Sequence, residues 1–102
     1  MITKFQGETI KKEVEILNAD KTPADLTGCT ATAGIKQGTT TTRLTPLISG
    51  NIVSIRIDDT SDMIGIYELE IKLKDTTLDI DVIARDTIVI QTSVIPDFTE
   101  VP

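Results

Sequence analysis

Apolar and polar residues alternate along most of this chain with the period of two that is typical of β-strands. The alternation is clearest over residues 66–73, where one face would carry Tyr67, Leu69, Ile71 and Leu73. The opposite face of the same segment would carry Glu68, Glu70 and Lys72. We therefore predict a strand that buries one face and exposes the other to solvent.

Six further segments carry a similar alternation, and we predict strands over residues 8–17, 29–35, 44–48, 52–58, 78–82 and 86–95. In the first of these, Ile10, Val14 and Ile16 share the inward face. Lys12 is the exception on that face, and we expect it near the open end of the strand or at a sheet edge. In the segment 78–82 the alternation predicts three inward residues, Leu78, Ile80 and Val82.

Turn-forming residues separate these strands. Residues 18–25 (NADKTPAD) end the first strand, Gly38 and the polar run 39–42 predict a hairpin tip, and residues 49–51 predict a second tight hairpin. Pro46 lacks a backbone N–H, which confines the segment 44–48 to a sheet edge or a bulge. Residues 58–65 break the alternation, and we expect a loop there with a single helical turn capped by aspartate or threonine.

About seven strands, with no helical segment long enough for a crossover, predict an all-β fold that is antiparallel throughout. Two sheets packed face to face, as in an immunoglobulin-like β-sandwich, would bury one face of every strand. A small β-barrel is the alternative architecture. We expect one domain over residues 1–95 and a C-terminal tail or linker over residues 96–102.

The charge balance narrows the choice of partners. Ten Lys and Arg against 16 Asp and Glu give a net charge of −6, which opposes binding to a phosphate backbone. No apolar run approaches the roughly 18 residues that a membrane span needs. Residues 1–17 also lack the apolar stretch of a secretory signal. We expect no nucleic-acid or membrane partner, and a protein made in a cytoplasm.

The chain has no histidine and a single cysteine, Cys29. Without histidine, the Ser-His-Asp and Cys-His arrangements and the common zinc sites are excluded within this chain. Cys29 would begin an inward row of small side chains, with no cation cluster nearby to activate its thiol. We expect it to pack as a small hydrophobic residue.

One group of carboxylates resembles a metal site. Asp58, Asp59 and Asp62 lie close together in a predicted loop and could offer oxygen ligands to calcium. The ligand spacing of the EF-hand is absent, and capping of a helical turn explains the same residues. Asp79 and Asp81, on the outer face of one predicted strand, are weaker candidates. We expect no metal ion and no cofactor.

A carboxylate pair for glycoside hydrolysis could be sought in Glu68 and Glu70. Residues two apart on an exposed strand face lie side by side, however, without the cleft that would raise the pKa of one carboxyl group. Aromatic platforms for sugar are also missing, because Tyr67 is predicted to point inward and only Phe5 and Phe98 remain. We expect a protein that is not an enzyme and has no small-molecule substrate.

Sheet edges and the C-terminal segment are the remaining candidates for contacts. Unpaired backbone groups at a sheet edge must be blunted or used for assembly, and Pro46 and Lys12 are suited to blunting. The segment 94–102 (VIPDFTEVP) could be a docking arm, a linker or a frayed terminus. The pattern leaves these three alternatives open.

Two motifs carry a family resemblance. Asp25, Leu26, Thr27 and Gly28 lead into a strand, and Gly65, Tyr67 and Glu68 follow the predicted turn. With the order of strands around them, these features resemble the N-terminal domain of the upper baseplate proteins of tailed phages that infect Gram-positive bacteria, and related small phage tail modules. The resemblance covers nearly the whole chain.

The resemblance implies a virion protein made in the cytoplasm of a bacterial host. It would be a rigid immunoglobulin-like sandwich that packs against other tail or baseplate proteins, or against its own copies, without catalysis. The alternative is an immunoglobulin-like binding module of a bacterial surface protein, recognising carbohydrate or using calcium through Asp58, Asp59 and Asp62. A further alternative is an inhibitor that offers a sheet edge to a host protein.

Overall fold

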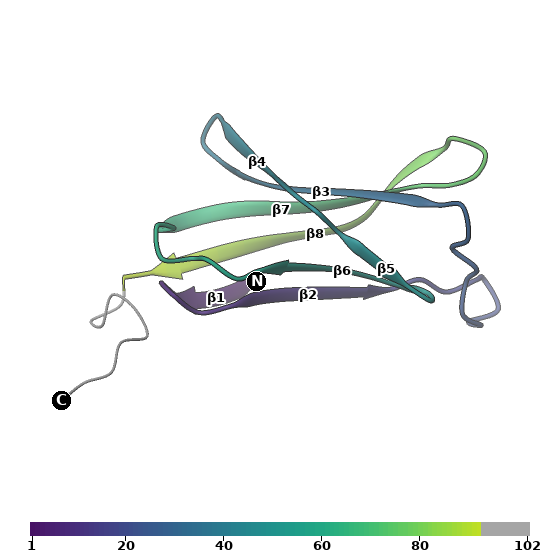
Figure 1. Cartoon of the computed structure of the whole chain (residues 1–102), viewed down its shortest axis with the longest axis horizontal. Coiled ribbons are helices and arrows are strands. Elements are labelled where there is room, and N and C mark those ends of the chain that lie inside the picture. Colours follow the sequence, from purple (N-terminus) through teal and green to yellow (C-terminus); the bar gives the residue numbers. More distant parts are fainter. Residues whose placement is uncertain (93–102) are drawn as a thin grey trace.

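The chain folds into two β-sheets that share one core. Figure 1 shows the computed structural model, which describes residues 1–92. The larger sheet has the order β1 (Ile2–Phe5), β8 (Ile80–Gln91), β7 (Gly65–Lys74), β3 (Thr30–Gln37) and β4 (Thr40–Leu44). The smaller sheet has the order β2 (Ile10–Glu15), β6 (Ile52–Ile57) and β5 (Leu47–Ser49).

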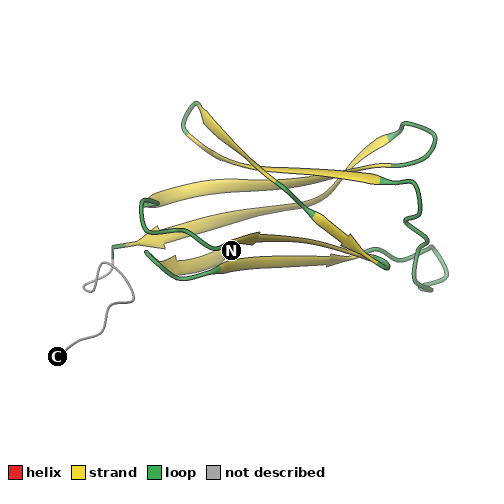
Figure 2. Cartoon of the chain, viewed as in Figure 1, coloured by secondary structure: helices red, strands yellow, loops and turns green. Residues whose placement is uncertain are grey.

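The all-β prediction is confirmed for the described residues, which contain no helix (Figure 2). In particular, none of their segments is a helix that could cross a membrane. The two sheets are not closed into a barrel, because β1 and β4 form the edges of one sheet and β2 and β5 those of the other. The alternative of a small barrel is therefore wrong.

The prediction of a wholly antiparallel fold is also wrong. β1 pairs in parallel with β8, with Ile2 opposite Ile88, whereas every other pairing of the described strands is antiparallel. The chain then turns at residues 6–9 and continues as β2 in the other sheet. A four-residue strand before the first long alternation gives little sequence signal, which is why β1 was not among the predicted strands.

A buried threonine holds this crossing between the sheets. Thr60 is fully buried, its hydroxyl donates to the Glu8 carbonyl at 2.7 Å, and it accepts from the Gly7 N–H at 2.9 Å. Both functions of the hydroxyl are therefore satisfied, as a buried polar group requires. Thr60 lies in the loop between β6 and β7, so this pair of bonds ties the N-terminal crossing to a distant loop.

The core lies between the two sheets and is built almost wholly from β-branched and other aliphatic side chains. It contains Ile10, Val53, Ile55 and Ile57 from the smaller sheet and Ala33, Ile35, Leu69, Ile71, Leu73, Ile88 and Ile90 from the larger one. Leu26 closes the core from the loop before β3 with 7% of its surface exposed. The inward faces predicted for residues 29–35, 52–58 and 66–73 are confirmed.

Two predicted strands are parts of one long strand, β8, and the predicted face of the first part is wrong. Leu78, Ile80 and Val82 were expected inside but are 70%, 61% and 50% exposed. The register shifts by one residue where Ile71 pairs with Ala84 and Lys72 pairs with Val82, so that Ile83 is the extra residue of a β-bulge. Because side chains alternate between the two faces with a period of two, one extra residue moves every side chain of the preceding segment to the opposite face.

The threonine run is the other correction. Residues 39–42 were predicted as a hairpin tip, but only Gly38 and Thr39 form the turn, and β4 begins at Thr40. Pro46 lies between β4 and β5, where the chain leaves one sheet edge for the other. The edge position predicted for residues 44–48 is thus confirmed, although these residues include the end of β4 and the start of β5 rather than one strand. The hairpin predicted at residues 49–51 is confirmed as β5 and β6.

One local device occurs at four turns, two of which lie in the loop between β2 and β3. In each, an aspartate accepts hydrogen bonds from the hydroxyl and the N–H of a Ser or Thr two residues later: Asp20 with Thr22, Asp25 with Thr27, Asp59 with Ser61, and Asp75 with Thr77. These contacts, led by the hydroxyl, lower the pKa of each aspartate from its usual value. Such turns fix the loops without help from the core.

Some expectations lie outside the described residues. Residues 93–95 of the predicted last strand, the C-terminal segment 94–102 and Phe98 belong to this part of the chain. The proposed domain boundary after residue 95 lies there as well.

Candidate functional site

The outer face of the larger sheet is hollowed at its centre. The hollow has a volume of about 300 Å³ and lies where β3, β4, β7 and β8 run side by side. Gly34 lies at the floor, opposite Arg43 on β4 and Glu70 on β7. Since glycine has no side chain, longer side chains on the neighbouring strands surround an open floor at this position.

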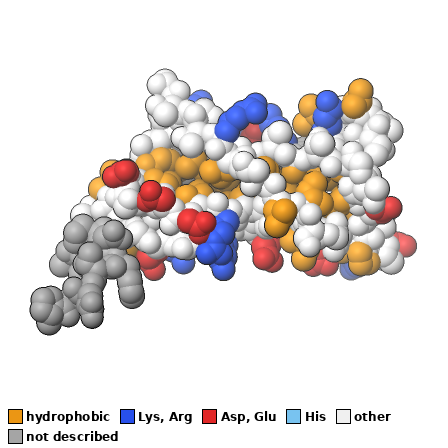
Figure 3. Space-filling view, viewed as in Figure 1, with side chains coloured by type: hydrophobic (Ala, Val, Ile, Leu, Met, Phe, Trp, Pro, Cys, Tyr) orange, Lys and Arg blue, Asp and Glu red, His pale blue; other side chains and the backbone are white. Residues whose placement is uncertain are grey.

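Cations dominate the rim of this hollow. It is lined by four cationic residues, Lys36, Arg43, Lys72 and Arg85, and by two carboxylates, Glu68 and Glu70. The rim therefore carries a formal excess of positive charge on a protein whose net charge is −6. Figure 3 shows Lys and Arg side chains gathered on the upper side of the molecule, between the tips of the β3–β4 and β7–β8 hairpins.

Ion pairs use only some of these charges. Glu70 pairs with Arg85 at 3.1 Å and with Lys72 at 3.5 Å. Among residues 1–92, neither Lys36 nor Arg43 forms an ion pair, and both side chains are exposed. Lys36 and Arg43 are therefore the cations of the hollow that are available to a bound anionic group.

Arg43, Lys36, Lys72 and Arg85 were not singled out from the sequence. They come from four different strands, and only the pairing of β3 with β4 and β7, and of β7 with β8, brings them together. The one available signal was Gly34 within an otherwise regular strand pattern, since an isolated glycine in a strand marks a bulge or a close approach. That signal does not reveal which cations surround it.

The structure does not bring the predicted metal candidates together. The Asp58 carboxylate accepts from the Arg56 guanidinium, and Asp59 accepts from the Ser61 N–H at 3.2 Å. Residues 1–92 contain no group of three His, Cys, Asp or Glu side chains arranged to hold a metal ion. The expected helical turn is a hydrogen-bonded turn, in which the Met63 N–H donates to the Thr60 carbonyl at 3.1 Å.

The other acidic candidates lie on strand β7 and at the β7–β8 hairpin. Asp79 belongs to the tip of the β7–β8 hairpin, where its N–H donates to Asp75 at 3.0 Å, and Asp81 is exposed. Glu68 and Glu70 lie on the outer face of β7 as predicted, but Glu70 is held by Arg85 and Lys72. This arrangement suits charge pairing at a surface more than acid–base chemistry.

Tyr67 points inward as predicted and packs against the core. Its hydroxyl oxygen accepts from the Ile64 N–H at 3.1 Å, three residues earlier in the chain. Phe5 is half-exposed at the end of β1. The side chain of Tyr67 therefore fastens the loop that enters β7 to the start of that strand.

Cys29 lies just before β3 and packs against the core, as predicted. It shares the inward side of the chain with Ala31 and Ala33. We expect Cys29→Ala and Cys29→Val to fold normally, with the free energy of unfolding changed by roughly 1 kcal/mol or less, because such swaps nearly conserve volume. Urea denaturation followed by circular dichroism measures the change. Loss of partner binding by a fully folded variant would contradict the packing role.

Exposed apolar side chains gather at both ends of the larger sheet. Leu78, Ile80 and Val82 lie together on the β7–β8 hairpin, which we call the apolar arm. At the other end of β7 lie Ile64 and Ile66, exposed by 49% and 63%. Leu78 adopts a positive φ of 69°, which a leucine rarely does, and its N–H donates to the Asp75 carbonyl at 3.1 Å. The turn thus holds Leu78 in place although its side chain faces solvent.

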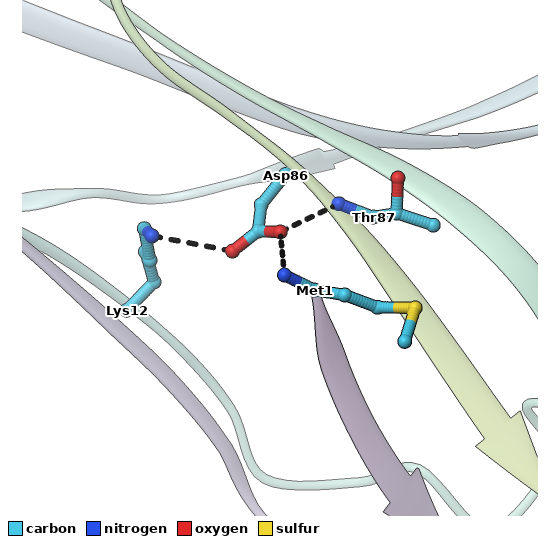
Figure 4. A network of polar contacts seen from close by, with 4 residues as sticks. All are labelled: Met1, Lys12, Asp86 and Thr87. Carbon is cyan, nitrogen blue, oxygen red and sulfur yellow. Dashed lines mark hydrogen bonds and ion pairs between the residues drawn. The ribbon is translucent and has the colours of Figure 1, made fainter.

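A network of charges joins the two sheets beside the core. Asp86 on β8 accepts from the N-terminal ammonium of Met1 at 2.9 Å and from the Thr87 N–H at 2.8 Å (Figure 4). Lys12, on the opposite sheet, reaches its other oxygen at 3.2 Å. The ammonium is the main cause that lowers the pKa of Asp86 to about 2. Lys12 lies on an edge strand, as predicted. Its ammonium group pairs with Asp86 of the other sheet.

Comparison with protein-family models, with curated proteins and with solved structures finds no match for this chain. Its function has to be inferred from its own surfaces. Those surfaces are the cationic hollow, the open edge at β4 and the apolar side chains at the two ends of the larger sheet.

Proposed function

We propose that this chain is a non-enzymatic structural protein of a phage or prophage tail or baseplate, which works through contacts with neighbouring proteins. The family resemblance supplies the virion context. The observation that carries the assembly role is the apolar arm, since three large apolar side chains on a tightly bonded hairpin face solvent instead of the core. Exposed apolar patches of this kind mark contact surfaces.

We further propose that the fold is immunoglobulin-like, which the order of the strands supports. In variable-type immunoglobulin domains one sheet contains strands G, F, C and C′, and the other contains B, E and D. The orders β8-β7-β3-β4 and β2-β6-β5 follow the same sequence of connections. On this assignment β7 corresponds to strand F, at the start of which such domains carry a tyrosine bonded to the preceding backbone. Tyr67 and its bond from the Ile64 N–H occupy that position.

An assembly role is also consistent with the chemistry of the surface. Among the carboxylates considered for a site, Asp58 and Glu70 form ion pairs and Asp59 accepts a hydrogen bond within a turn. The contact surfaces, in contrast, are apolar or cationic and lie on one sheet. A partner would then be recognised by shape, apolar burial and charge rather than converted chemically.

Mass spectrometry of purified particles tests the proposed location. We expect the protein in particles induced from the source strain, at a constant ratio to the major tail protein through successive density gradients. An abundant host cytoplasmic protein is the control, because its ratio should fall with each gradient. Consistent absence from particles that are complete in their other tail proteins would contradict the virion role.

A further inference from the structure

The edge strand β4 is the least protected edge of the described sheets. Its sequence, TTTRL, contains no proline and no carboxylate, and its first four residues are exposed. The other edges are short or charged: β1 has four residues and β5 has three, while β2 carries Lys11, Glu13 and Glu15 on its outer face. Short strands and charged side chains are the usual means of blocking an edge. β4 is longer than β1 and β5, and Arg43 is its single charged residue.

The hairpin geometry determines which backbone groups of β4 face solvent. Gln37 and Thr40 pair across a turn of two residues, of which the first, Gly38, has a φ of 59°. The pair that closes such a turn exchanges hydrogen bonds, and the next pair does not. The backbone groups of Thr41 and Arg43 therefore point away from β3, into solvent. These groups can accept a further strand.

The side chains of the same two residues line the cationic hollow. A strand added to β4 would lie about 4.8 Å away, and every second side chain on it would face the hollow. Arg43 would be its immediate neighbour, with Lys36 on the next strand. Because neither cation has an ion-pair partner among residues 1–92, a carboxylate on the added strand would gain a new partner without displacing an existing one.

Charge also argues against a second copy of this chain as the added strand. Antiparallel pairing of β4 with itself would bring two Arg43 side chains and two cationic hollows onto one continuous sheet face. Like charges opposite one another on a sheet face are destabilising. The net charge of −6 does not oppose an acidic partner at this site, because distant surface charges are screened beyond roughly 8 Å at physiological salt.

We propose that β4 binds an extended acidic segment of a partner protein by antiparallel strand addition, with carboxylates of that segment facing Arg43 and Lys36. The inference rests on the proposed function only in taking the partner to be a neighbour in assembly. The backbone groups of Thr41 and Arg43 would form hydrogen bonds with an added strand of any sequence, and the cationic hollow would favour strands with negatively charged side chains.

The test uses two labelled peptides of nine residues, one alternating Thr with Glu and the other alternating Thr with Lys. Fluorescence anisotropy at physiological salt should show binding of the Glu peptide at least about tenfold tighter than that of the Lys peptide. Arg43→Glu should weaken binding of the Glu peptide by about tenfold or more. Lys11→Glu, which makes the same change of charge on the other sheet, is the matched control and should have little effect.

Two further measurements separate strand addition from general charge attraction. Thr41→Pro removes an outward N–H while leaving the bonds to β3 in place, so it should abolish binding in a protein whose thermal melt is unchanged. Amide hydrogen exchange at Thr41 and Arg43 should slow when the Glu peptide is bound. Equal loss from Arg43→Glu and Lys11→Glu, or binding without slower exchange, would overturn the proposal.

The remaining outcomes are also decisive. A lack of binding of the Glu peptide to the wild-type protein at millimolar concentration would overturn the proposal, as would a dimer that Thr41→Pro dissociates, because β4 would then pair with a second copy. These results are independent of the particle experiment. Absence from particles would remove the virion role without touching peptide binding, and a failed titration would leave the location in particles as it was.

Discussion

Replacing Ile71 with alanine should lower the free energy of unfolding by about 2–5 kcal/mol. Ile71 is fully buried on β7 in the larger sheet, and its neighbours on the adjacent strands are Ala33 and Ala84. Because both neighbours are small, neither can move in to fill the space that the shortened side chain leaves. We therefore expect a loss in the upper part of this range, measured by urea denaturation at neutral pH.

The matched control for Ile71→Ala is Val82→Ala in the next strand of the same sheet. Val82 is 50% exposed, and its substitution should change stability by about 0.5 kcal/mol or less. The comparison tests the β-bulge directly, since the alternation of the sequence would bury both residues. Equal losses in the two variants would show that Val82 is part of the core and that the register of β8 is wrong.

Replacing Asp86 with asparagine should cost about 1–2 kcal/mol at pH 7. The pKa of Asp86 is about 2 in the folded protein against a usual value of 3.8, and a shift of this size corresponds to about 2 kcal/mol of stability carried by the ionised form. Asparagine retains hydrogen-bonding capacity but not the charge that attracts Met1 and Lys12. Urea denaturation of both proteins at a series of pH values measures the difference.

The sign of the pH dependence follows from the lowered pKa. Since the folded pKa lies below the unfolded one, the contribution of Asp86 is present in full above the unfolded value of 3.8 and is lost as the pH falls toward 2. The difference between wild type and Asp86→Asn should therefore be largest near neutral pH and close to zero near pH 2. The four aspartates of the loop turns cancel in this difference, because both proteins contain them.

Asp58→Asn is the control for this series. The Asp58 side chain is 70% exposed and pairs only with Arg56, two residues away, so its replacement should have little effect at any pH. A loss from Asp86→Asn that is as large at pH 2 as at pH 7 would contradict the ion-pair network. It would point instead to a role of the side chain that does not depend on its charge.

Lys12 and Asp86 illustrate what local pattern could and could not predict. Lys12 was recognised as an exception on an apolar face, and its edge position was inferred correctly. Asp86 was not recognised, although it is the corresponding exception on β8. The two residues are 74 positions apart in the sequence. Only the packing of one sheet on the other brings the Lys12 ammonium to the Asp86 carboxylate, and this ion pair explains why each residue lies on an otherwise apolar face.

The candidate site shows the same division. Glu68 and Glu70 were placed correctly on the outer face of β7, because alternation within a strand is a local property. Their neighbours Arg43 and Arg85 could not be assigned to this face, since β4 was taken for a loop and β8 for two strands. A hollow that four strands build together has no counterpart in the pattern of any one of them.

The sequence by itself determined the all-β class, the inward row from Cys29 to Ile35, and the absence of histidine chemistry within the chain. Each of these depends on residue type or on alternation over a few neighbours. The tertiary structure decided the parallel pairing of β1, the outward face of the apolar arm and the cationic hollow beside β4. These features depend on the pairing and register of strands that are distant in the sequence. In β8, for example, one extra residue, Ile83, is enough to place the preceding side chains on the solvent face instead of the core face.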